Sequence, residues 1–230
     1  IAWLRQGQED KFRASIDEAL KAKADHVPAL IELVRASAQR GNIDEALAGL
    51  DKIPRQSSGA DEAHKLRGDL LLYGKRDMDA AMVAYRDALQ VNPSYLEGQA
   101  AVVQLLLLQG KTEAAAEALQ RLAKAAPGKP QTLYLQAMLA YAKNDLKAAQ
   151  EHAQKLVTLT PENFRALELA GMTELRLGAN VQAEALLAKA LQLEAGLPMA
   201  RRGLVTAYVR QGRLDKAMSA LPVDVERNDR

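Results

Sequence analysis

One short segment of this sequence resembles a phosphate-binding loop, Gly110-Lys111-Thr112. A complete motif of this kind has a further glycine five residues before the Gly-Lys pair, where backbone N–H groups cradle the phosphates. Leu105 occupies that position and lies inside an apolar segment typical of a helix. We therefore predict a turn between two helices at Gly110 and no nucleotide site.

Histidines and cysteines offer little further chemistry. The sequence has no cysteine, which excludes disulfides, thiolate metal sites and a cysteine nucleophile. Its three histidines, His26, His64 and His152, lie far apart, and none has a His or carboxylate partner at the spacing of a helical metal site. We predict no catalytic residue, no metal and no cofactor, and hence a protein that is not an enzyme.

Two groups of side chains point to recognition of a partner. Tyr134, Met138 and Tyr141 follow the i, i+4, i+7 spacing of one helix face, which is either a core stripe or a contact surface. The second group is basic and contains Arg201, Arg202, Arg210 and Arg213. These arginines form either a solvated face or a site for an anion or a C-terminal carboxylate.

A fixed period organises the elements that must position these side chains. Gly110, Asn144, Gly178 and Gly212 are spaced 34 residues apart. An alanine follows each of them by five residues: Ala115, Ala149, Ala183 and Ala217. Apolar segments of about helix length flank each turn, and this pattern is typical of a helix-turn-helix solenoid.

The composition agrees with helices that pack closely. The chain is 48% apolar but only 4% aromatic, so alanine and leucine dominate over the residues that favour sheets. Basic and acidic residues are interleaved with a net charge of +2, which predicts no nucleic-acid partner. No apolar run reaches the roughly 18–20 residues that span a bilayer, so we expect no membrane contact by this piece itself.

We expect one solenoid over residues 1–222, with turns near residues 7, 41, 75, 110, 144, 178 and 212, and a polar tail over 223–230. The sequence starts inside a repeat and with Ile1, so the solenoid is expected to be truncated at its N-terminal end. Gly110 follows Gly41 by two periods plus one residue, and we place the extra residue in the turn Gly74–Asp77. A helix is expected to reach Ile53 and to end at Pro54, ahead of an insert over residues 55–60.

These columns resemble the tetratricopeptide repeat (TPR) family. The small column that follows each turn contains Ala46, Ala81, Ala115, Ala149, Ala183 and Ala217. A larger apolar column lies four residues later, at Ile16, Leu50, Tyr85, Leu119, Leu187 and Leu221, with Ala153 as a small exception. Pro93, Pro127 and Pro161 match the closing prolines, whereas Ala195 replaces one of them. The resemblance implies an all-α, right-handed superhelix of about six and a half helix-turn-helix units.

In the TPR family the first helix of each unit lines a concave groove that binds a peptide or a partner protein. The resemblance therefore implies a protein-interaction scaffold. Carried onto this chain, the register assigns to the groove Arg35, Lys65, Asp69, Tyr73, Gln104, Leu108, Tyr134, Met138, Tyr141, Glu168, Met172, Arg176, Arg202 and Arg210. Three alternatives stay open, namely a carbohydrate-binding solenoid, an enzymatic solenoid and a structural spacer.

A narrower resemblance concerns the segment Gln182–Leu221, which is similar to the TPR lipoproteins of the exosortase (PEP-CTERM) sorting system. It implies a role in bacterial protein sorting and exopolysaccharide export, in the cell envelope or periplasm, although a cytoplasmic location stays open. Because a truncated solenoid exposes apolar ends, we also expect end-to-end self-association.

Overall fold

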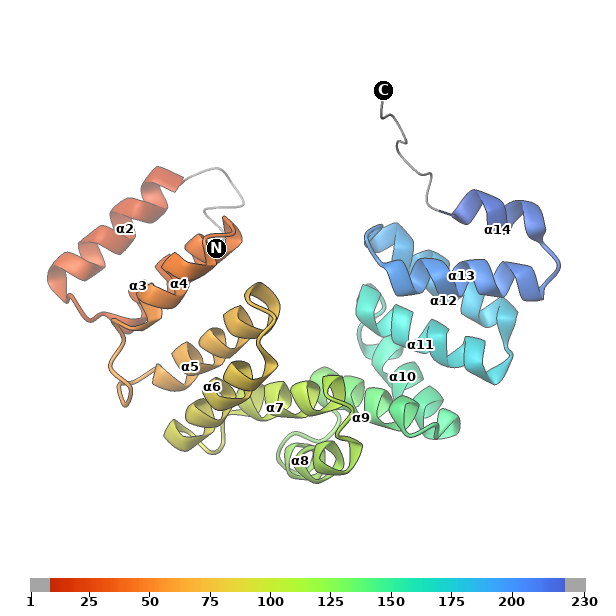
Figure 1. Ribbon diagram of the computed structural model, residues 1–230, viewed down its shortest axis with the longest axis horizontal. Coiled ribbons are helices and arrows are strands. Elements are labelled where there is room, and N and C mark those ends of the chain that lie inside the picture. Colours follow the sequence, from red (N-terminus) through yellow and green to blue (C-terminus); the bar gives the residue numbers. More distant parts are fainter. Residues whose placement is uncertain (1–8, 222–230) are drawn as a thin grey trace. The chain divides into compact units, whose positions relative to one another are not determined.

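The computed structural model describes residues 9–221, with the side chains of residues 9, 10 and 12 excepted (Figure 1). Thirteen α-helices and one π-helical turn make up this part of the chain, which contains no strand. The expected turn at Gly7 and the expected tail at 223–230 lie outside the described residues. The prediction of an all-α fold is confirmed.

The helices alternate between first and second members of helix-turn-helix segments, after α2 (Glu9–Ala22). The first helices are α3 (Val27–Gln39), α5 (Ala60–Asp69) continued by the π-helical turn η1 (Leu70–Gly74), α7 (Leu96–Leu108), α9 (Pro130–Ala142), α11 (Phe164–Leu177) and α13 (Pro198–Arg210). The second helices are α4 (Ile43–Leu50), α6 (Met78–Val91), α8 (Thr112–Ala125), α10 (Leu146–Leu159), α12 (Asn180–Leu193) and α14 (Leu214–Ala220).

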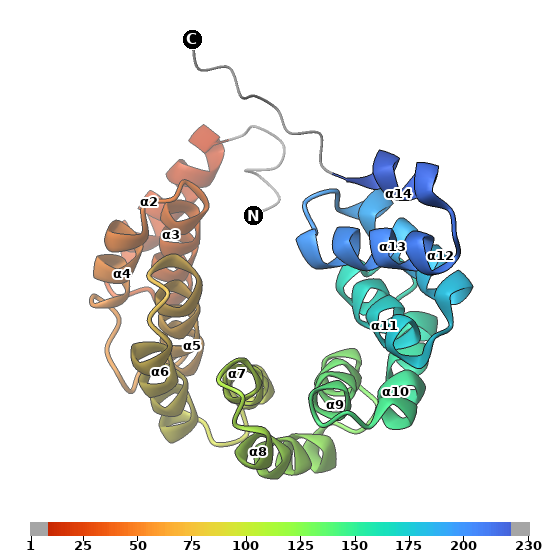
Figure 2. The same cartoon turned by 45° about the vertical axis from the view of Figure 1, so that its right-hand side comes forward.

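The chain forms two compact units, residues 1–108 and residues 109–230, which we call unit 1 and unit 2. In unit 1, α3 packs against α4 and α5 packs against α6. In unit 2, the pairs are α9 with α10, α11 with α12 and α13 with α14, and each second helix also packs against the next first helix (Figure 2). A single solenoid through both units stays a prediction.

Side chains at the turns satisfy the free N–H groups of the second helices in two places. Asp77 accepts a hydrogen bond from Ala80 N at 2.9 Å, and Asp145 accepts one from Ala148 N at 3.1 Å. Asn42 precedes α4, but its side-chain amide donates to Glu45 and forms no cap. These caps fix where the second helices begin.

The alanine column is buried where the helices pack together. Five of its members are completely buried, with 0% of their surface exposed: Ala46, Ala81, Ala115, Ala149 and Ala183. Ala217 is 5% exposed. Alanine at these positions lets the paired helices approach closely, because a longer side chain would hold them apart. In the larger column Leu221 is the exception, since α14 ends at Ala220 and Leu221 is 51% exposed.

The extra residue of the third turn is accommodated earlier than expected. At four turns an N–H after the turn donates to a carbonyl five residues before it, as Asp145 N does to Ala140 O. In the third turn Asp77 N reaches back six residues, to Leu71 O, and Lys75 N donates to Leu70 O across the π-helical turn. The residue with positive φ is then Arg76 (φ 58°), where other turns have glycine or asparagine.

This geometry predicts that Arg76→Gly stabilises the protein. A left-handed conformation costs a residue with a Cβ about 1–2 kcal/mol, and the unfolded-chain entropy of glycine offsets part of the gain. We expect a net increase in the free energy of unfolding of about 0.5–1 kcal/mol, measured by urea denaturation. The reverse change at an equivalent turn, Gly178→Arg (φ 83°), should destabilise; equal midpoints for both variants and the parent protein would contradict this account.

Helix α4 is shorter than expected. It has 8 residues, whereas α6, α8, α10 and α12 have 14 each. The expectation that it reaches Ile53 is wrong, because the helix ends at Leu50 and single turns follow through Ile53. Pro54 contributes to the early end, because it has no N–H to donate to the carbonyl of Leu50 and its ring disfavours helical backbone at Ile53. The chain then continues through the insert to Gly59, which precedes α5 with φ 87°.

Candidate functional site

The first helices of unit 1 carry six of the predicted groove residues, on a surface that we call face 1. Arg35 on α3 donates to Glu32 Oε1 on the same helix at 2.6 Å and to Glu62 on α5. Burial lowers the pKa of Arg35, but its hydrogen bonds and charge interactions with Glu32 and Glu62 outweigh this effect and raise the pKa above its usual value. The charge of Arg35 is thus fully compensated by carboxylates.

The same compensation occurs one helix further along face 1. Lys65 Nζ lies 2.7 Å from Asp69 Oδ2, and Tyr85 of α6 donates to the other oxygen of Asp69 at 2.9 Å. At the end of η1, Tyr73 is 61% exposed and its hydroxyl accepts a hydrogen bond from Gln104 Nε2 of α7 at 2.9 Å. The structure therefore brings together the predicted residues of successive first helices.

Face 1 ends at Leu108, the last residue of α7, which is 48% exposed. With Tyr73 it forms the apolar part of this face, whereas the charged residues lie on α3 and α5. Each of its cations within the predicted set, Arg35 and Lys65, has a carboxylate partner. Face 1 therefore carries no excess of positive charge from these residues.

The first helices of unit 2 (α9, α11 and α13) carry the other eight predicted residues, on a surface that we call face 2. Arg176 of α11 donates to the backbone oxygen of Tyr141 at 3.1 Å and to the side-chain oxygen of Asn144. Its guanidinium also lies 4.5 Å from the centre of the Tyr141 ring, within the range of a cation–π interaction. Arg176 thus connects α11 to the C-terminal end of α9.

Arg210 repeats this arrangement one helix pair later, within unit 2. It donates to the backbone oxygen of Leu175 at 2.8 Å, and so connects α13 to the C-terminal end of α11. In both cases the acceptor lies 35 residues before the arginine and is a carbonyl in the last turn of a helix, which also accepts a backbone N–H of the following turn. Glu168 of α11 forms a further connection, because it accepts a hydrogen bond from Ala200 N in the first turn of α13 at 2.9 Å.

The stripe of Tyr134, Met138 and Tyr141 is half-buried, so it is neither a full core stripe nor a fully exposed surface. Tyr134 packs against the core cluster around Leu133 and Leu156. On α11, Met172 is half-buried too and packs against the cluster that contains Leu175 and Leu187. The part of each side chain that remains accessible supplies aromatic and thioether surface to face 2.

Face 2 differs from face 1 in the partners of its cations. Arg176 and Arg210 donate only to neutral oxygens, and Arg202, which is exposed, has no hydrogen bond or ion pair from its side chain within residues 9–221. Glu168 is the one carboxylate among the predicted residues of this face. The sequence register placed these residues together, but it did not indicate which of the cations would be compensated.

The other candidate chemistry of the sequence has structural explanations. Gly110 adopts φ 69° in a turn, and Leu105 is completely buried in α7, as expected of a turn between helices. His26 precedes α3 and accepts a hydrogen bond from Ala29 N through Nδ1 at 3.3 Å, which makes it a helix cap. Across the described helices, none combines the length and the apolar character that a membrane span requires.

Comparisons with solved structures show the same fold. A thermophilic TPR protein of Thermus thermophilus is 25% identical and has a TM-score of 0.61, with 70% of this chain and 88% of that chain covered. The Cut9–Hcn1 hetero-tetramer of the APC/C has a TM-score of 0.81 at 15% identity, over 96% of this chain and 45% of that chain. PilF of Pseudomonas aeruginosa has a TM-score of 0.60 at 20% identity, over 70% of this chain and 72% of that chain.

Sequence comparisons agree. Cellulose synthase operon protein C of Pseudomonas fluorescens (strain SBW25) is 25% identical over 97% of this chain, although the chain spans only 19% of that protein's length. Two tetratricopeptide repeat profiles match the chain. One matches residues 4–70, and the other matches twice, at residues 66–130 and 134–198. The matches cover most of the helices described above. This chain therefore belongs to the tetratricopeptide repeat family.

Proposed function

We propose that this chain is a protein-interaction scaffold that binds a peptide or a partner protein on its first-helix faces. The TPR fold is consistent with such a role, and predicted groove residues of successive first helices bond to one another in two places, Gln104 to Tyr73 and Arg176 to Tyr141. Face 2 is proposed as the main binding surface, with face 1 as a second, more polar one.

The observation that carries this proposal is the positive charge on face 2, where Arg176, Arg202 and Arg210 form no ion pair with a carboxylate of residues 9–221. Arg176, Arg202 and Arg210 outnumber Glu168, and the guanidinium of Arg176 lies over the ring of Tyr141. Tyrosine and arginine are the side chains that most often dominate interfaces, and methionine adapts to varied partners. We therefore propose that the partner is an acidic segment that also carries apolar side chains.

Two of these arginines are held in place before a partner binds. Hydrogen bonds to backbone oxygens restrict Arg176 and Arg210 but leave their charge unneutralised. A planar guanidinium has five N–H donors, so each can still donate to an incoming carboxylate. Because fewer side-chain conformations are lost on binding, such pre-organised cations lower the entropic cost of association.

A charge-reversal variant tests the role of face 2. The probe is a library of random 12-residue peptides displayed on phage and selected on the 230-residue chain. We expect the selected peptides to be enriched in Asp and Glu next to Leu, Phe or Met. Arg202→Glu should weaken their binding by about tenfold or more, measured by fluorescence anisotropy, because like charges that meet at an interface cost several kcal/mol.

Arg121→Glu is the matched control, since Arg121 is exposed on the second helix α8 and changes charge by the same amount. It should leave the binding of the selected peptides within about twofold. Equal losses for the two variants, or selected peptides without acidic enrichment, would count against face 2 as the binding surface. Arg202→Glu should not change the melting temperature, because its side chain bonds to no described residue.

Unlike Arg202→Glu, the double replacement of Tyr141 and Arg176 with alanine is expected to change stability. Because Arg176 connects α11 to α9, this double variant should lose stability as well as binding. Its binding must therefore be measured at a temperature where circular dichroism shows it fully folded.

We further propose that the chain serves an exopolysaccharide export system of the bacterial envelope. The support is the similarity to cellulose synthase operon protein C, at 25% identity. The role in exosortase-linked sorting, and the lipoprotein that it implies, stay predictions from the resemblance of Gln182–Leu221. Partner capture from separate envelope and cytosol fractions of the parent organism, with Arg202→Glu as the negative control, tests the location; a specific partner found only in the cytosol would contradict it.

A further inference from the structure

A hollow lies between α4, α5 and α6 of unit 1, on residues outside the predicted groove set. We call it the α4–α6 hollow. Its volume is about 240 Å³, and its floor consists of Leu50, Ile53, Ala60 and Ala63, which are at most 6% exposed. A second hollow of about 420 Å³ adjoins it and shares Arg55, His64 and Asp87. Both lie within unit 1.

The early end of α4 creates this space. A second helix of 14 residues would continue beside α5 and α6, but α4 ends after 8 residues and the chain passes into the insert. The insert is ordered by local bonds, since Ser57 donates to Pro54 O through both its backbone N–H and its hydroxyl. The hollow therefore has a defined wall that carries Arg55.

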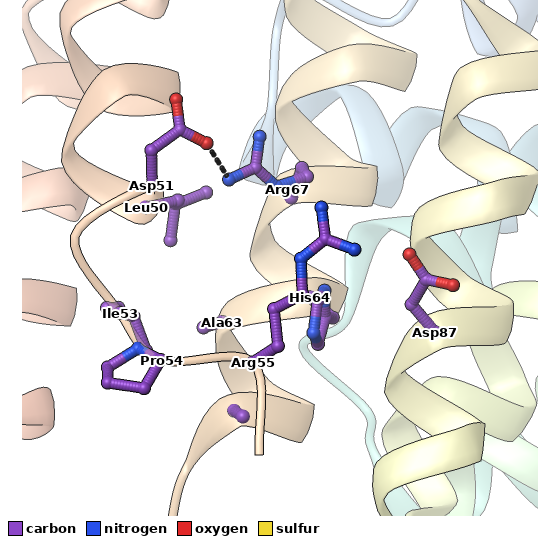
Figure 3. Close-up of a pocket in the computed structure, with 10 residues that line it drawn as sticks. Leu50, Asp51, Ile53, Pro54, Arg55, Ala63, His64, Arg67 and Asp87 are labelled. Atoms are coloured by element: carbon purple, nitrogen blue, oxygen red, sulfur yellow. Dashed lines mark hydrogen bonds and ion pairs between the residues drawn. The ribbon is translucent and has the colours of Figure 1, made fainter. Parts of the chain in front are cut away.

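Charged side chains of both signs reach this hollow from three elements (Figure 3). Arg67 of α5 donates to Asp51 at 2.6 Å through one nitrogen, which leaves its other N–H groups for a ligand. Arg55 of the insert, His64 of α5 and Asp87 of α6 line the hollow and have no hydrogen bond or ion pair with any residue of the described range 9–221. Figure 3 shows the guanidinium of Arg55 between Arg67 and the carboxylate of Asp87.

We propose that the α4–α6 hollow binds a small oxyanion that also carries a hydroxyl group. Arg55 and Arg67 are suited to the negatively charged oxygens, because guanidinium groups bind carboxylate and phosphate through paired N–H donors. His64 can donate one further hydrogen bond. The hollow has room for such a ligand together with waters, whose share of liquid volume is about 30 Å³ each.

Asp87 determines the kind of anion. A carboxylate repels an anion without hydrogens, but it accepts a hydrogen bond from a ligand hydroxyl. Near neutral pH inorganic phosphate keeps a hydroxyl, whereas sulfate of nearly the same size and shape has none. A sugar acid such as glucuronate also combines a carboxylate with hydroxyl groups. The shared chemistry is thus an oxyanion with a hydroxyl donor, and phosphate and sugar acids are its two sources.

Titrations monitored by NMR on the uniformly ¹⁵N-labelled 230-residue chain test this assignment. The probes are inorganic phosphate, sulfate, glucuronate and glucose, at constant pH and ionic strength. We expect phosphate, glucuronate or both to shift the backbone amides of residues 51–67 and 84–91, whereas sulfate and glucose should not. Phosphate alone identifies one source and glucuronate alone the other; no shift from either anion, or equal binding of sulfate and phosphate, would overturn the proposal.

Three variants locate the site. Arg55→Gln should weaken anion binding by about tenfold or more, since hydrogen bonds to charged groups contribute most to such sites. Asp87→Asn should strengthen sulfate binding relative to phosphate, because it removes the carboxylate of the hollow that has no cation partner among the described residues, whereas Asp51 stays bonded to Arg67. Arg86→Gln, which removes the neighbouring exposed charge on α6, is the control and should bind like the parent chain; a loss equal to that of Arg55→Gln would mean that the effect is only one of net charge.

This proposal is independent of the binding function of faces 1 and 2. Arg55, Arg86 and Asp87 do not belong to the predicted groove residues, so Arg55→Gln should leave binding of the selected acidic peptides unchanged. In the same way, Arg202→Glu on unit 2 should leave the anion titration unchanged. Failure of one proposal is therefore visible without failure of the other.

Discussion

Replacing Tyr85 with alanine is expected to lower the free energy of unfolding by about 3–5 kcal/mol, the range for removal of a large buried aromatic ring. Tyr85 is 1% exposed, and its ring lies directly over Gly68 of α5. A Cβ atom built on Gly68 would come within 2.3 Å of the ring, so glycine is what allows the ring to fit. Without the ring, a cavity remains that α5 and α6 cannot close by small shifts.

The hydroxyl of Tyr85 makes a smaller contribution. Burial raises the pKa of Tyr85, and the neighbouring charge of Asp69 raises it further, so the hydroxyl keeps its proton and donates to Asp69. Tyr85→Phe removes only this bond and should cost about 1 kcal/mol. Asp69 keeps its ion pair with Lys65 in that variant.

Urea unfolding followed by circular dichroism, with hydrogen exchange of the α5 and α6 amides as a local readout, separates the two variants. The local readout is needed because the repeats of a solenoid unfold partly independently. A loss of less than about 1 kcal/mol for Tyr85→Ala would show that the site collapses around the missing ring, contrary to the packing described here.

Ala149→Leu is the second large effect, with an expected loss of about 1–3 kcal/mol from overpacking. Ala149 has no exposed surface and lies where α10 packs against α9. A leucine there must push the helices apart or adopt a strained rotamer. Ala183→Leu repeats the test at the equivalent position of the next helix pair, where α12 packs against α11.

The control introduces the same side chain at a different position of α10. Lys147 is exposed, so Lys147→Leu should change stability by no more than about 0.5 kcal/mol. A denaturation midpoint that is the same for Ala149→Leu and Lys147→Leu would contradict the alanine register. A loss of stability in Ala149→Leu without one in Ala183→Leu would show that the alanine is closely packed in only one of the two helix pairs.

The arrangement of helices within each unit could be predicted from the sequence because it depends on short-range rules. Glycine or asparagine is needed where the backbone turns with positive φ, as at Gly178 and Asn144. Alanine is needed where paired helices touch, as at Ala149 and Ala183. Both requirements recur every 34 residues, so the period itself predicts the helix pairs and the register of the first-helix faces.

Local structure at irregular turns was harder to predict. The sequence showed that one residue was added between Gly41 and Gly110, but a π-helical turn or a longer loop can each absorb one residue. The structure places it in η1, where Lys75 N donates to Leu70 O, and this leaves Arg76 rather than a glycine at the left-handed position. Both outcomes add one residue and keep the period, so the sequence pattern alone does not choose between them.

The charge balance of each face was decided by tertiary structure alone. The sequence determined that Arg35 and Arg176 occupy equivalent faces of first helices, but long side chains bond to whatever acceptor lies within reach. For Arg35 one such acceptor is the carboxylate of Glu62, 27 residues later in the sequence. For Arg176 it is the backbone oxygen of Tyr141, 35 residues earlier. The α4–α6 hollow has the same origin. Pro54 predicted a helix end after Ile53, whereas α4 ends at Leu50, and only the packing of three helices brings Arg55, His64 and Asp87 to one space.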